Sequence, residues 1–461
     1  MTWASHFTKS ISLVIVLPLI LTHLETADIA LWYLFLTIIA LQSLVDAGFS
    51  PTFARIIAYI MGGSSLKDLK QPKQADPQKY NVTTLNCAYS TMKVVFKYLS
   101  TLWTLLLATI GTLVLFKPIG SASDKQSAWL AWGIIVIVSY ISLHGNLYVS
   151  YLQGVNQIAL FRRYEALTAL GGVVTSALVL IAGGGLLGLV VSNQGWQLIS
   201  VVVNKTLARS ANDATMRSFV NMPFCKDVYE AVWPSAWRSG MGLLMCYGLI
   251  QASGVIYAQL GEPASVAIYL LALRLITTVT QFSQAPFYSK LPVLTRLYAE
   301  NRREELVRLA KHGMAFAYWS YVVGFVTLGL LGPHLLKYID SKTPFPDQML
   351  WSLLGFGFFV ERYGAMHIQL YSTTNRIIWH IANGITGLIF IFMSFFLYDI
   401  LEIYAFPASI IAGYLGFYFW YAAVHSYSAF DLNFKSFEFK TSFIPMCVIL
   451  IYCLFSLCST I

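Results

Sequence analysis

Long apolar runs recur along almost the whole chain, and they constrain its fold more than any other feature. The hydrocarbon core of a bilayer is about 30 Å thick, and a helix needs about 20 apolar residues to cross it. Backbone polar groups inside that core must be paired within the segment, so such runs are helices. The chain is 57% hydrophobic and only 11% charged, whereas roughly 25% of residues are charged in soluble domains. The sequence therefore predicts an all-α polytopic membrane protein.

Twelve transmembrane helices are expected, and a thirteenth if the last apolar run also crosses the membrane. The expected spans lie near residues 5–24, 29–57, 98–117, 127–150, 164–182, 185–204, 231–259, 264–288, 312–332, 347–371, 376–398, 403–426 and 442–460. The first run is expected to be a retained helix, because Pro18 interrupts it and no small-residue cleavage site follows.

The Lys and Arg residues predict the orientation of these spans. With the N-terminus in the cytoplasm, most of the 30 Lys and Arg residues fall on the cytoplasmic side, as the positive-inside rule requires. The connections at 61–97, 205–230 and 289–311 are then cytoplasmic, and 289–311 has the pattern of an interfacial amphipathic helix. The net charge of +9 thus reflects topology, and a nucleic-acid partner is not expected.

An internal repeat predicts two halves. Residues 25–39 align without gaps on residues 262–276, with six of fifteen positions identical, among them Glu25 and Glu262. Six expected spans separate the two segments, so both halves would run in the same direction through the membrane, as a parallel repeat does. We expect a six-helix lobe over 1–210, a second over 211–426, and a cytoplasmic loop with the possible extra helix over 427–461.

Charged residues inside membrane spans are costly, and each is a functional candidate. Arg274 lies near the middle of the eighth span, and Thr277, Thr278 and Gln281 follow it at helical spacing. This polar stripe can face water or a ligand. The structural alternative is an Arg held in a salt bridge between helices.

Five further charges are candidates. Arg362, near mid-depth of the tenth span, is a candidate anion contact, and the adjacent Glu361 points about 100° away from it on a helix. Arg238 and Arg55 are candidate anion contacts that could instead extend to the inner interface. Glu361 and Asp46 are candidates for proton coupling, and Asp46 could also pair with Arg55.

The sequence contains no motif for nucleotide hydrolysis, nucleophilic catalysis or metal binding. It contains no nucleotide-binding glycine loop, no nucleophile–base pair and no metal-ligand cluster, so neither an enzyme nor a cofactor or metal site is expected. The six cysteines show no paired spacing and predict no disulfide framework. His144 and His367 are single intramembrane histidines, which are more often packing residues than proton carriers.

Three segments carry a family resemblance. Residues 44–55 (Leu-Val-Asp-Ala-Gly-Phe-Ser-Pro-Thr-Phe-Ala-Arg), and residues 232–242 followed by 262–274, resemble the corresponding regions of O-antigen-type polysaccharide flippases. That family belongs to the multidrug/oligosaccharidyl-lipid/polysaccharide exporter superfamily.

The resemblance implies two six-helix lobes around a central cavity that opens alternately to either side of the membrane. It implies transport of an undecaprenyl-pyrophosphate-linked oligosaccharide to the outer leaflet of a bacterial inner membrane, with membrane lipids and glycan polymerase or assembly proteins as partners. The family lines its cavity with cations, and Arg274 and Arg238 occupy fitting positions; Asp46, Arg55 and Glu361 match less well.

Two other functions remain open. A drug or cation exporter of the same fold would be disfavoured by the excess of intramembrane Arg over acidic residues. A membrane-embedded glycan polymerase, ligase or acyltransferase would need a positioned catalytic group and substantial external loops, and the sequence shows neither.

Overall fold

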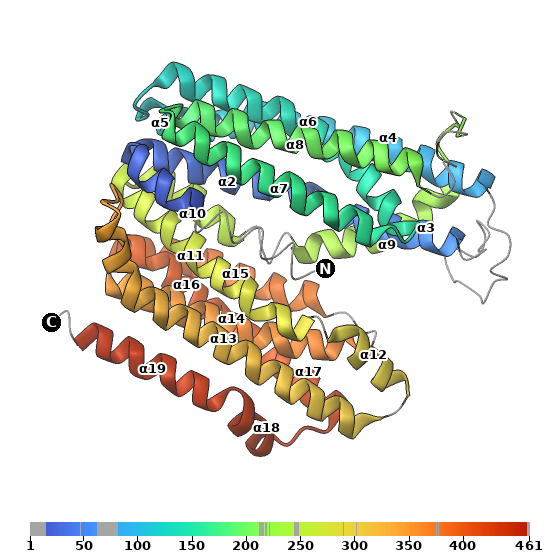
Figure 1. The fold of residues 1–461 in the computed structure, drawn as a ribbon. Coiled ribbons are helices and arrows are strands. Elements are labelled where there is room, and N and C mark those ends of the chain that lie inside the picture. Colours follow the sequence, from blue (N-terminus) through green and yellow to red (C-terminus); the bar gives the residue numbers. More distant parts are fainter. Residues whose placement is uncertain are drawn as a thin grey trace. The chain divides into compact units, whose positions relative to one another are not determined.

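The computed structural model describes residues 15–46, 48–61, 82–211, 216, 219–220, 222–243, 249–288, 290–300, 302–374, 376 and 378–458. Within these ranges all regular structure is helical (Figure 1). The start of the first expected span and most of the connection at 61–97 lie outside the described residues. The chain divides into two compact units, Met1–Gln251 and Ala252–Ile461.

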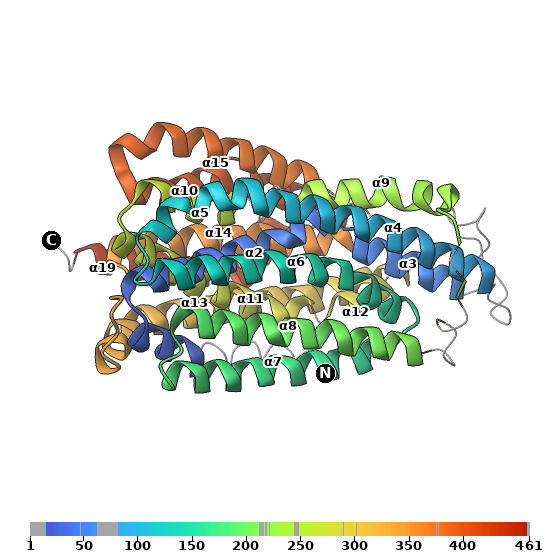
Figure 2. The ribbon, with the colours of Figure 1, turned by 90° about the horizontal axis from the view of Figure 1, so that it is seen from above.

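Unit 1 is built around α6 (Lys125–Gly154), which packs most extensively against three of the other helices. These are α3 (Phe49–Met61), α4 (Val82–Leu106) and α8 (Gly185–Ser210). Figures 1 and 2 both show α6 and α8 side by side. The remaining helices are η2 (Leu107–Gly111) and α5 (Thr112–Gly120), which continue α4, with α2 (Thr26–Asp46), α7 (Ile158–Ile181) and α9 (Lys226–Leu243).

Unit 2 is built around α14 (Gln348–Ser372), most of whose side chains are buried. It begins where the Asp347 carboxylate accepts a hydrogen bond of 2.9 Å from the backbone N–H of Leu350, which caps the helix. Its packing partners include α11 (Pro263–Tyr288), α13 (Arg303–Tyr338), α16 (Ala405–Gly413), α17 (Phe419–Phe430) and α19 (Phe443–Cys458). The other elements are α10 (Leu249–Leu260), which crosses the unit boundary, α12 (Leu291–Ala299), α15 (Trp379–Leu401), η5 (Glu402–Tyr404), η6 (Tyr414–Tyr418) and α18 (Phe434–Thr441).

The membrane architecture is confirmed in its class but not in its count. Among the described residues, eight helices are long and apolar enough to span a membrane, or nine if α18 and α19, bent by 54°, form one span. The expected span at 29–57 is broken into α2 and α3 at Gly48, whose φ of 75° is in the left-handed region. The helical stretch Trp379–Phe430 reverses at Glu402, with φ 47°, so that α15 packs against α16 as a hairpin.

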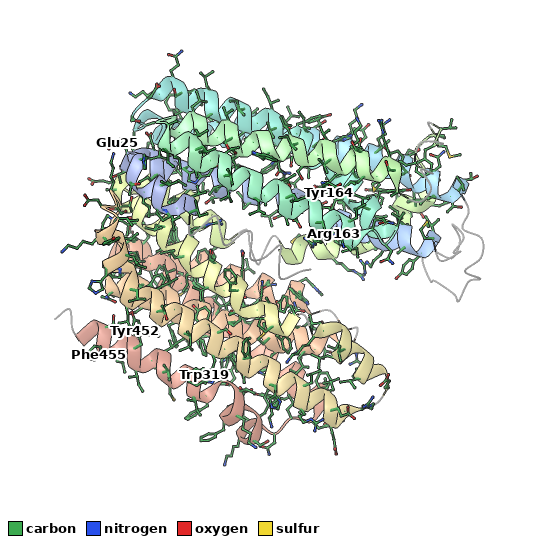
Figure 3. All side chains as sticks on the ribbon, viewed as in Figure 1. Glu25, Arg163, Tyr164, Trp319, Tyr452 and Phe455 are labelled. Carbon is green, nitrogen blue, oxygen red and sulfur yellow. A yellow bond between two sulfur atoms is a disulfide. The ribbon has the colours of Figure 1, made fainter. Side chains whose placement is uncertain are left out.

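The last helix, α19, packs against α13 and α14 within unit 2. The ring of Tyr452 on α19 lies 5.2 Å from that of Phe325 on α13, whereas Phe455 is 75% exposed (Figure 3). An apolar ring turned outward suits a helix that faces lipid, because hydrocarbon solvates it as well as a protein core does.

The two repeat segments begin their helices in the same way. The carbonyl of Glu25 accepts the N–H of Ile29 at 2.9 Å at the start of α2, and the carbonyl of Glu262 accepts the N–H of Val266 at 3.0 Å at the start of α11. The units nevertheless divide after Gln251 rather than at residue 210, because α9 packs against α2, α3 and α4. The six-helix lobes and their parallel direction stay predictions.

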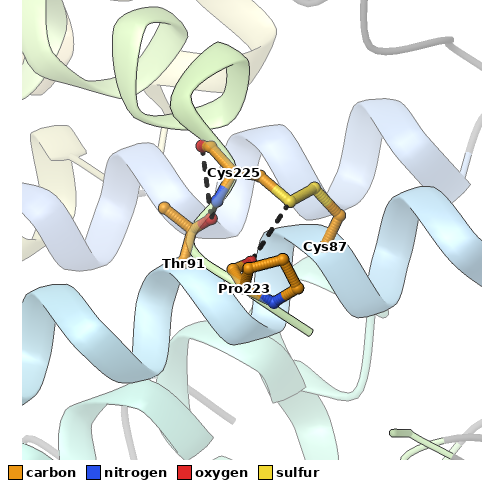
Figure 4. Close-up of a disulfide and its surroundings, with 4 residues drawn as sticks. All are labelled: Cys87, Thr91, Pro223 and Cys225. Carbon is orange, nitrogen blue, oxygen red and sulfur yellow. Dashed lines mark hydrogen bonds between the residues drawn. A yellow bond between two sulfur atoms is a disulfide. The ribbon is translucent and has the colours of Figure 1, made fainter. Parts of the chain in front are cut away.

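The expectation that no cysteines pair is wrong for Cys87 and Cys225, which form a disulfide between α4 and the start of α9 (Figure 4). Thr91, one turn along α4, receives a hydrogen bond of 3.1 Å from the backbone N–H of Cys225. Their separation of 138 residues hides this pairing from any spacing rule, since packing brings the two positions together.

We expect Cys87 and Cys225 to resist maleimide in protein purified without reductant, and to react after reduction. Cys87→Ser should make Cys225 reactive without reductant, because the thiol loses its partner. A gel-shift assay with a polyethylene-glycol maleimide counts the reactive thiols. Equal labelling with and without reductant in the unfolded wild-type protein would show that the disulfide does not form.

Candidate functional site

The polar stripe of α11 contains one exposed cation. Arg274 is exposed, although Leu273 and Ile276 beside it are buried, and it lies near the middle of a candidate membrane span. The hydroxyl of Thr278 donates to the backbone carbonyl of Arg274 at 2.7 Å, so it is satisfied within the helix. Gln281, two turns past Arg274, is also exposed. Arg274 and Gln281 are therefore the long polar side chains that this face can offer a ligand.

The same helix is tied to α14 further along its length. Arg362 donates to the side-chain oxygen of Gln284 at 3.1 Å, and Gln369 donates to the hydroxyl of Tyr288 at 3.2 Å. Both acceptors are on α11, so two partly buried hydrogen bonds fix its register against α14.

Arg362 and Glu361 form an ion pair with a distance of 3.0 Å. Adjacent residues do not share a helix face, but the long Arg362 side chain reaches back to the Glu361 carboxylate. Only 2% of the Arg362 side chain and 13% of the Glu361 side chain are exposed. In this structure the pair is interior, and Arg362 does not lie on the exposed face that carries Arg274.

The candidates in unit 1 lie on α2, α3 and α9, of which α3 and α9 pack against each other. Arg55 on α3 and Arg238 on α9 are both exposed, and Arg55 donates to the hydroxyl of Thr52 at 3.3 Å. Asp46, at the end of α2, accepts from the backbone N–H and the hydroxyl of Ser50 at 3.2 and 3.0 Å. It thereby holds the first turn of α3, and its coupling role stays a prediction.

Sequence reasoning missed Glu438, a buried acid on α18 that lies 3.2 Å from the imidazole of His367. The residue falls in the stretch expected to be a loop between the last two spans. A weak signal was available, because Asn433 is a good helix N-cap residue and starts a helix that has an acid on its second turn.

Comparison with known proteins identifies the fold. Neither a protein-family model nor a curated protein sequence matches the chain. Solved structures do match. An inward-facing multidrug resistance MATE family transporter of the MOP superfamily superposes with a TM-score of 0.69 and 14% identity, covering 90% of this chain and 93% of that one. The lipid II flippase MurJ, in an inward closed conformation, superposes with a TM-score of 0.62 and 12% identity, covering 99% and 97%. The eukaryotic MATE transporter AtDTX14 gives 0.55 and 13%, covering 98% and 100%.

These matches extend over nearly the whole chain, and the proteins are transporters or flippases rather than enzymes. Structural matches at 12–14% sequence identity show which fold this chain has, but they do not show which substrate it binds. The fold that the expected resemblance implies is thus confirmed, whereas membership of the polysaccharide flippases is not shown. The chain is a multi-pass membrane protein whose fold is that of these matched structures.

Proposed function

We propose that this protein flips an undecaprenyl-pyrophosphate-linked oligosaccharide from the cytoplasmic to the outer leaflet of a bacterial inner membrane by alternating access. The observation that carries the proposal is Arg274, an exposed guanidinium near the middle of a candidate span. A cation at that depth is too costly to face hydrocarbon and normally faces water, a partner or a ligand.

The chemistry of the substrate fits this cation. A pyrophosphate and its sugars lose their hydration in a bilayer core, and protein hydrogen bonds must replace it. A guanidinium can hold phosphate oxygens through two parallel hydrogen bonds, which are stronger than bonds between neutral groups. Arg55 and Arg238 are further exposed cations of the chain. One matched structure is described as a lipid II flippase, and the polyprenyl tail can stay in lipid during such transport.

A cationic drug is the second candidate substrate, since several of the matched structures are MATE transporters. Such a substrate would need a carboxylate to receive it. Only 13% of the Glu361 side chain is exposed, and Asp46 is half-buried. The exposed candidates are arginines, so the charges favour an anion.

The test uses purified protein in liposomes that contain a fluorescent undecaprenyl-pyrophosphate-linked oligosaccharide. Transport converts label that is protected from an impermeant quencher into quenchable label. We expect an unlabelled pyrophosphate-linked lipid to compete and a cationic drug not to. Competition by the cation alone, or no movement of the lipid, would refute the proposal.

The proposed direction depends on the orientation, which a labelling experiment can test. In a background without native cysteines, Val220→Cys and Glu304→Cys should stay unmodified when intact cells meet an impermeant maleimide, because their connections are expected to be cytoplasmic. Ala182→Cys, in the expected external connection after α7, is the matched control and should react. Efficient labelling at positions 220 and 304 would show that these connections are external and that the orientation is the opposite of the expected one.

A further inference from the structure

The short helix α18 turns one face into unit 2 and the other face outward. Phe437, Glu438 and Thr441 make up the inward face and are buried. The helix packs against α13 and α19. Figure 1 shows it at the end of α19, with which it makes a bend of 54°. Its outward face therefore continues the surface of a helix that is apolar enough to span a membrane.

Glu438 fastens α18 to the rest of unit 2. Its Oε1 atom accepts hydrogen bonds from Tyr363 on α14, at 3.2 Å, and from Tyr427 on α17. Its Oε2 atom accepts from Thr441, at 3.2 Å, and from Ser442. These four hydrogen bonds satisfy the buried carboxylate and hold the helix in one orientation. The outward face is thus preorganised, and a ligand that binds it loses less free energy to ordering.

The outward face combines two aromatic rings with two cations. Phe439 and Phe443 are 61% and 50% exposed, and their ring centroids lie 5.3 Å apart in a stacked arrangement. Lys435 precedes Phe439 by four residues, and Lys440 precedes Phe443 by three. Both lysines are exposed. Residues three or four apart are neighbours on a helix surface, so the two ammonium groups flank the pair of rings.

The acids closest to these lysines in the sequence are already engaged. The carboxylate of Asp431 pairs with Arg303 at the start of α13. The carboxylate of Glu438 is buried among the hydroxyl groups described above. The charge of Lys435 and Lys440 is therefore available to an anion from outside the chain.

The position of α18 along the chain indicates its depth in the bilayer. No charged residue follows Lys440, and the side chains of Ile451, Leu454 and Phe455 on α19 are 66%, 64% and 75% exposed, as on a helix that faces lipid. Charged side chains gather where a span leaves the hydrocarbon. The helix α18 thus lies where the hydrocarbon meets the lipid headgroups, and its rings can insert while its lysines extend to the phosphates.

We propose that the outward face of α18, formed by Lys435, Phe439, Lys440 and Phe443, is a binding site for the headgroup of an anionic phospholipid. The two ammonium groups bind the phosphate, and the acyl chains lie against the stacked rings. A zwitterionic headgroup carries its own cation and gains less from the two lysines. In the expected orientation this face meets the cytoplasmic leaflet, whose surface is negatively charged. The site is separate from Arg274 and does not depend on the transported substrate.

A fluorophore on α18 reports which lipid lies beside it. Ser436→Cys, at an exposed position next to Lys435, is labelled in a background without native cysteines and reconstituted in phosphatidylcholine vesicles. A minor fraction of the lipid is phosphatidylglycerol or phosphatidylcholine with brominated acyl chains, which quench the fluorophore on contact. Each lysine near a membrane surface strengthens binding of an anionic lipid about fivefold. Quenching should therefore reveal a preference of about 25-fold for phosphatidylglycerol.

Charge variants test whether the two lysines cause this preference. Lys435→Gln combined with Lys440→Gln should abolish it, whereas Lys435→Arg combined with Lys440→Arg should keep it. Lys337→Gln, which removes an exposed lysine at the opposite end of α13, is the matched control and should leave it unchanged. Equal quenching by the two lipids in the parent protein, or a preference that survives in the double Gln variant, would overturn the site. Loss of the preference on addition of inorganic phosphate at constant ionic strength would show a site for free anions instead of a lipid.

Native mass spectrometry tests the site in protein that keeps its cysteines. The parent protein, released from detergent that contains phosphatidylglycerol, should retain at least one more bound phosphatidylglycerol than the double Gln variant. Lys337→Gln should retain as many as the parent. Equal numbers in the parent and the double Gln variant would contradict the proposal, and equal elution in gel filtration confirms that the variants are folded.

Discussion

Arg274→Ala should reduce flipping of the lipid-linked oligosaccharide by at least about 100-fold. Hydrogen bonds to charged groups contribute about 1.5–3 kcal/mol each, and two of them link a guanidinium to phosphate oxygens. Their loss corresponds to two or more factors of ten, since about 1.4 kcal/mol is one factor. The rate at which the labelled lipid becomes accessible to the quencher in proteoliposomes measures the effect.

Graded and matched variants separate this role from a structural one. Arg274→Lys keeps the positive charge but cannot make two parallel hydrogen bonds to a phosphate. It should therefore retain partial activity, about tenfold below the wild type. Arg308→Ala removes another exposed arginine of unit 2, near the start of α13, and should transport normally. Protein amount and elution in gel filtration must be equal across the set. Wild-type transport by a well-folded Arg274→Ala protein would remove Arg274 from the substrate path.

The repeat adds an internal comparison to this experiment. Thr37 is the counterpart of Arg274 in the first half, and it is buried with its hydroxyl bonded to the carbonyl of Tyr33 at 2.8 Å. The helix start shared by Glu25 and Glu262 therefore forms without a cation at this position. A requirement for Arg274 would be a requirement of function rather than of the repeated local structure.

Apolar run length was enough to predict that this chain is built from long helices, because hydrocarbon leaves a segment no other way to pair its backbone. It was not enough to predict every helix break. The reversal at Glu402 falls in the connection expected between the spans at 376–398 and 403–426, whereas Gly48 interrupts an expected span through a local backbone conformation on which hydropathy carries no information. The mid-span charges were likewise visible, whereas their surroundings were not.

Arg362 and Glu438 show why the site could only partly be predicted. Helical spacing gives the face of α14 on which Arg362 lies, but not that α11 covers this face and presents Gln284. Glu438 lies in a short helix whose partners, His367 and Tyr363, are on α14. Such contacts depend on packing between distant segments, and one sequence without structure does not contain that information in readable form.

The pair of Arg362 and Glu361 leads to the second large effect. Removing one partner of a buried ion pair leaves an uncompensated charge and costs about 3–5 kcal/mol, whereas replacing both partners by neutral groups of similar volume is often nearly neutral. We therefore expect Arg362→Met to lower the free energy of unfolding by about that amount, and Glu361→Gln combined with Arg362→Met to recover most of it.

Thermal and denaturant unfolding of the purified single and double variants measures these changes in the free energy of unfolding. Flipping assays on the same samples show whether transport changes with stability. If Arg362 serves only to hold α11 against α14, the double variant should regain both stability and most of its transport. A double variant that is stable but inactive would place Arg362 in the substrate path, as its mid-span position first suggested. Equal stability of Arg362→Met and the wild type would show that the ion pair does not form. The expected recovery of both properties follows from the 2% exposure of Arg362, because a side chain enclosed by its own unit cannot reach a substrate without first leaving Glu361 unpaired.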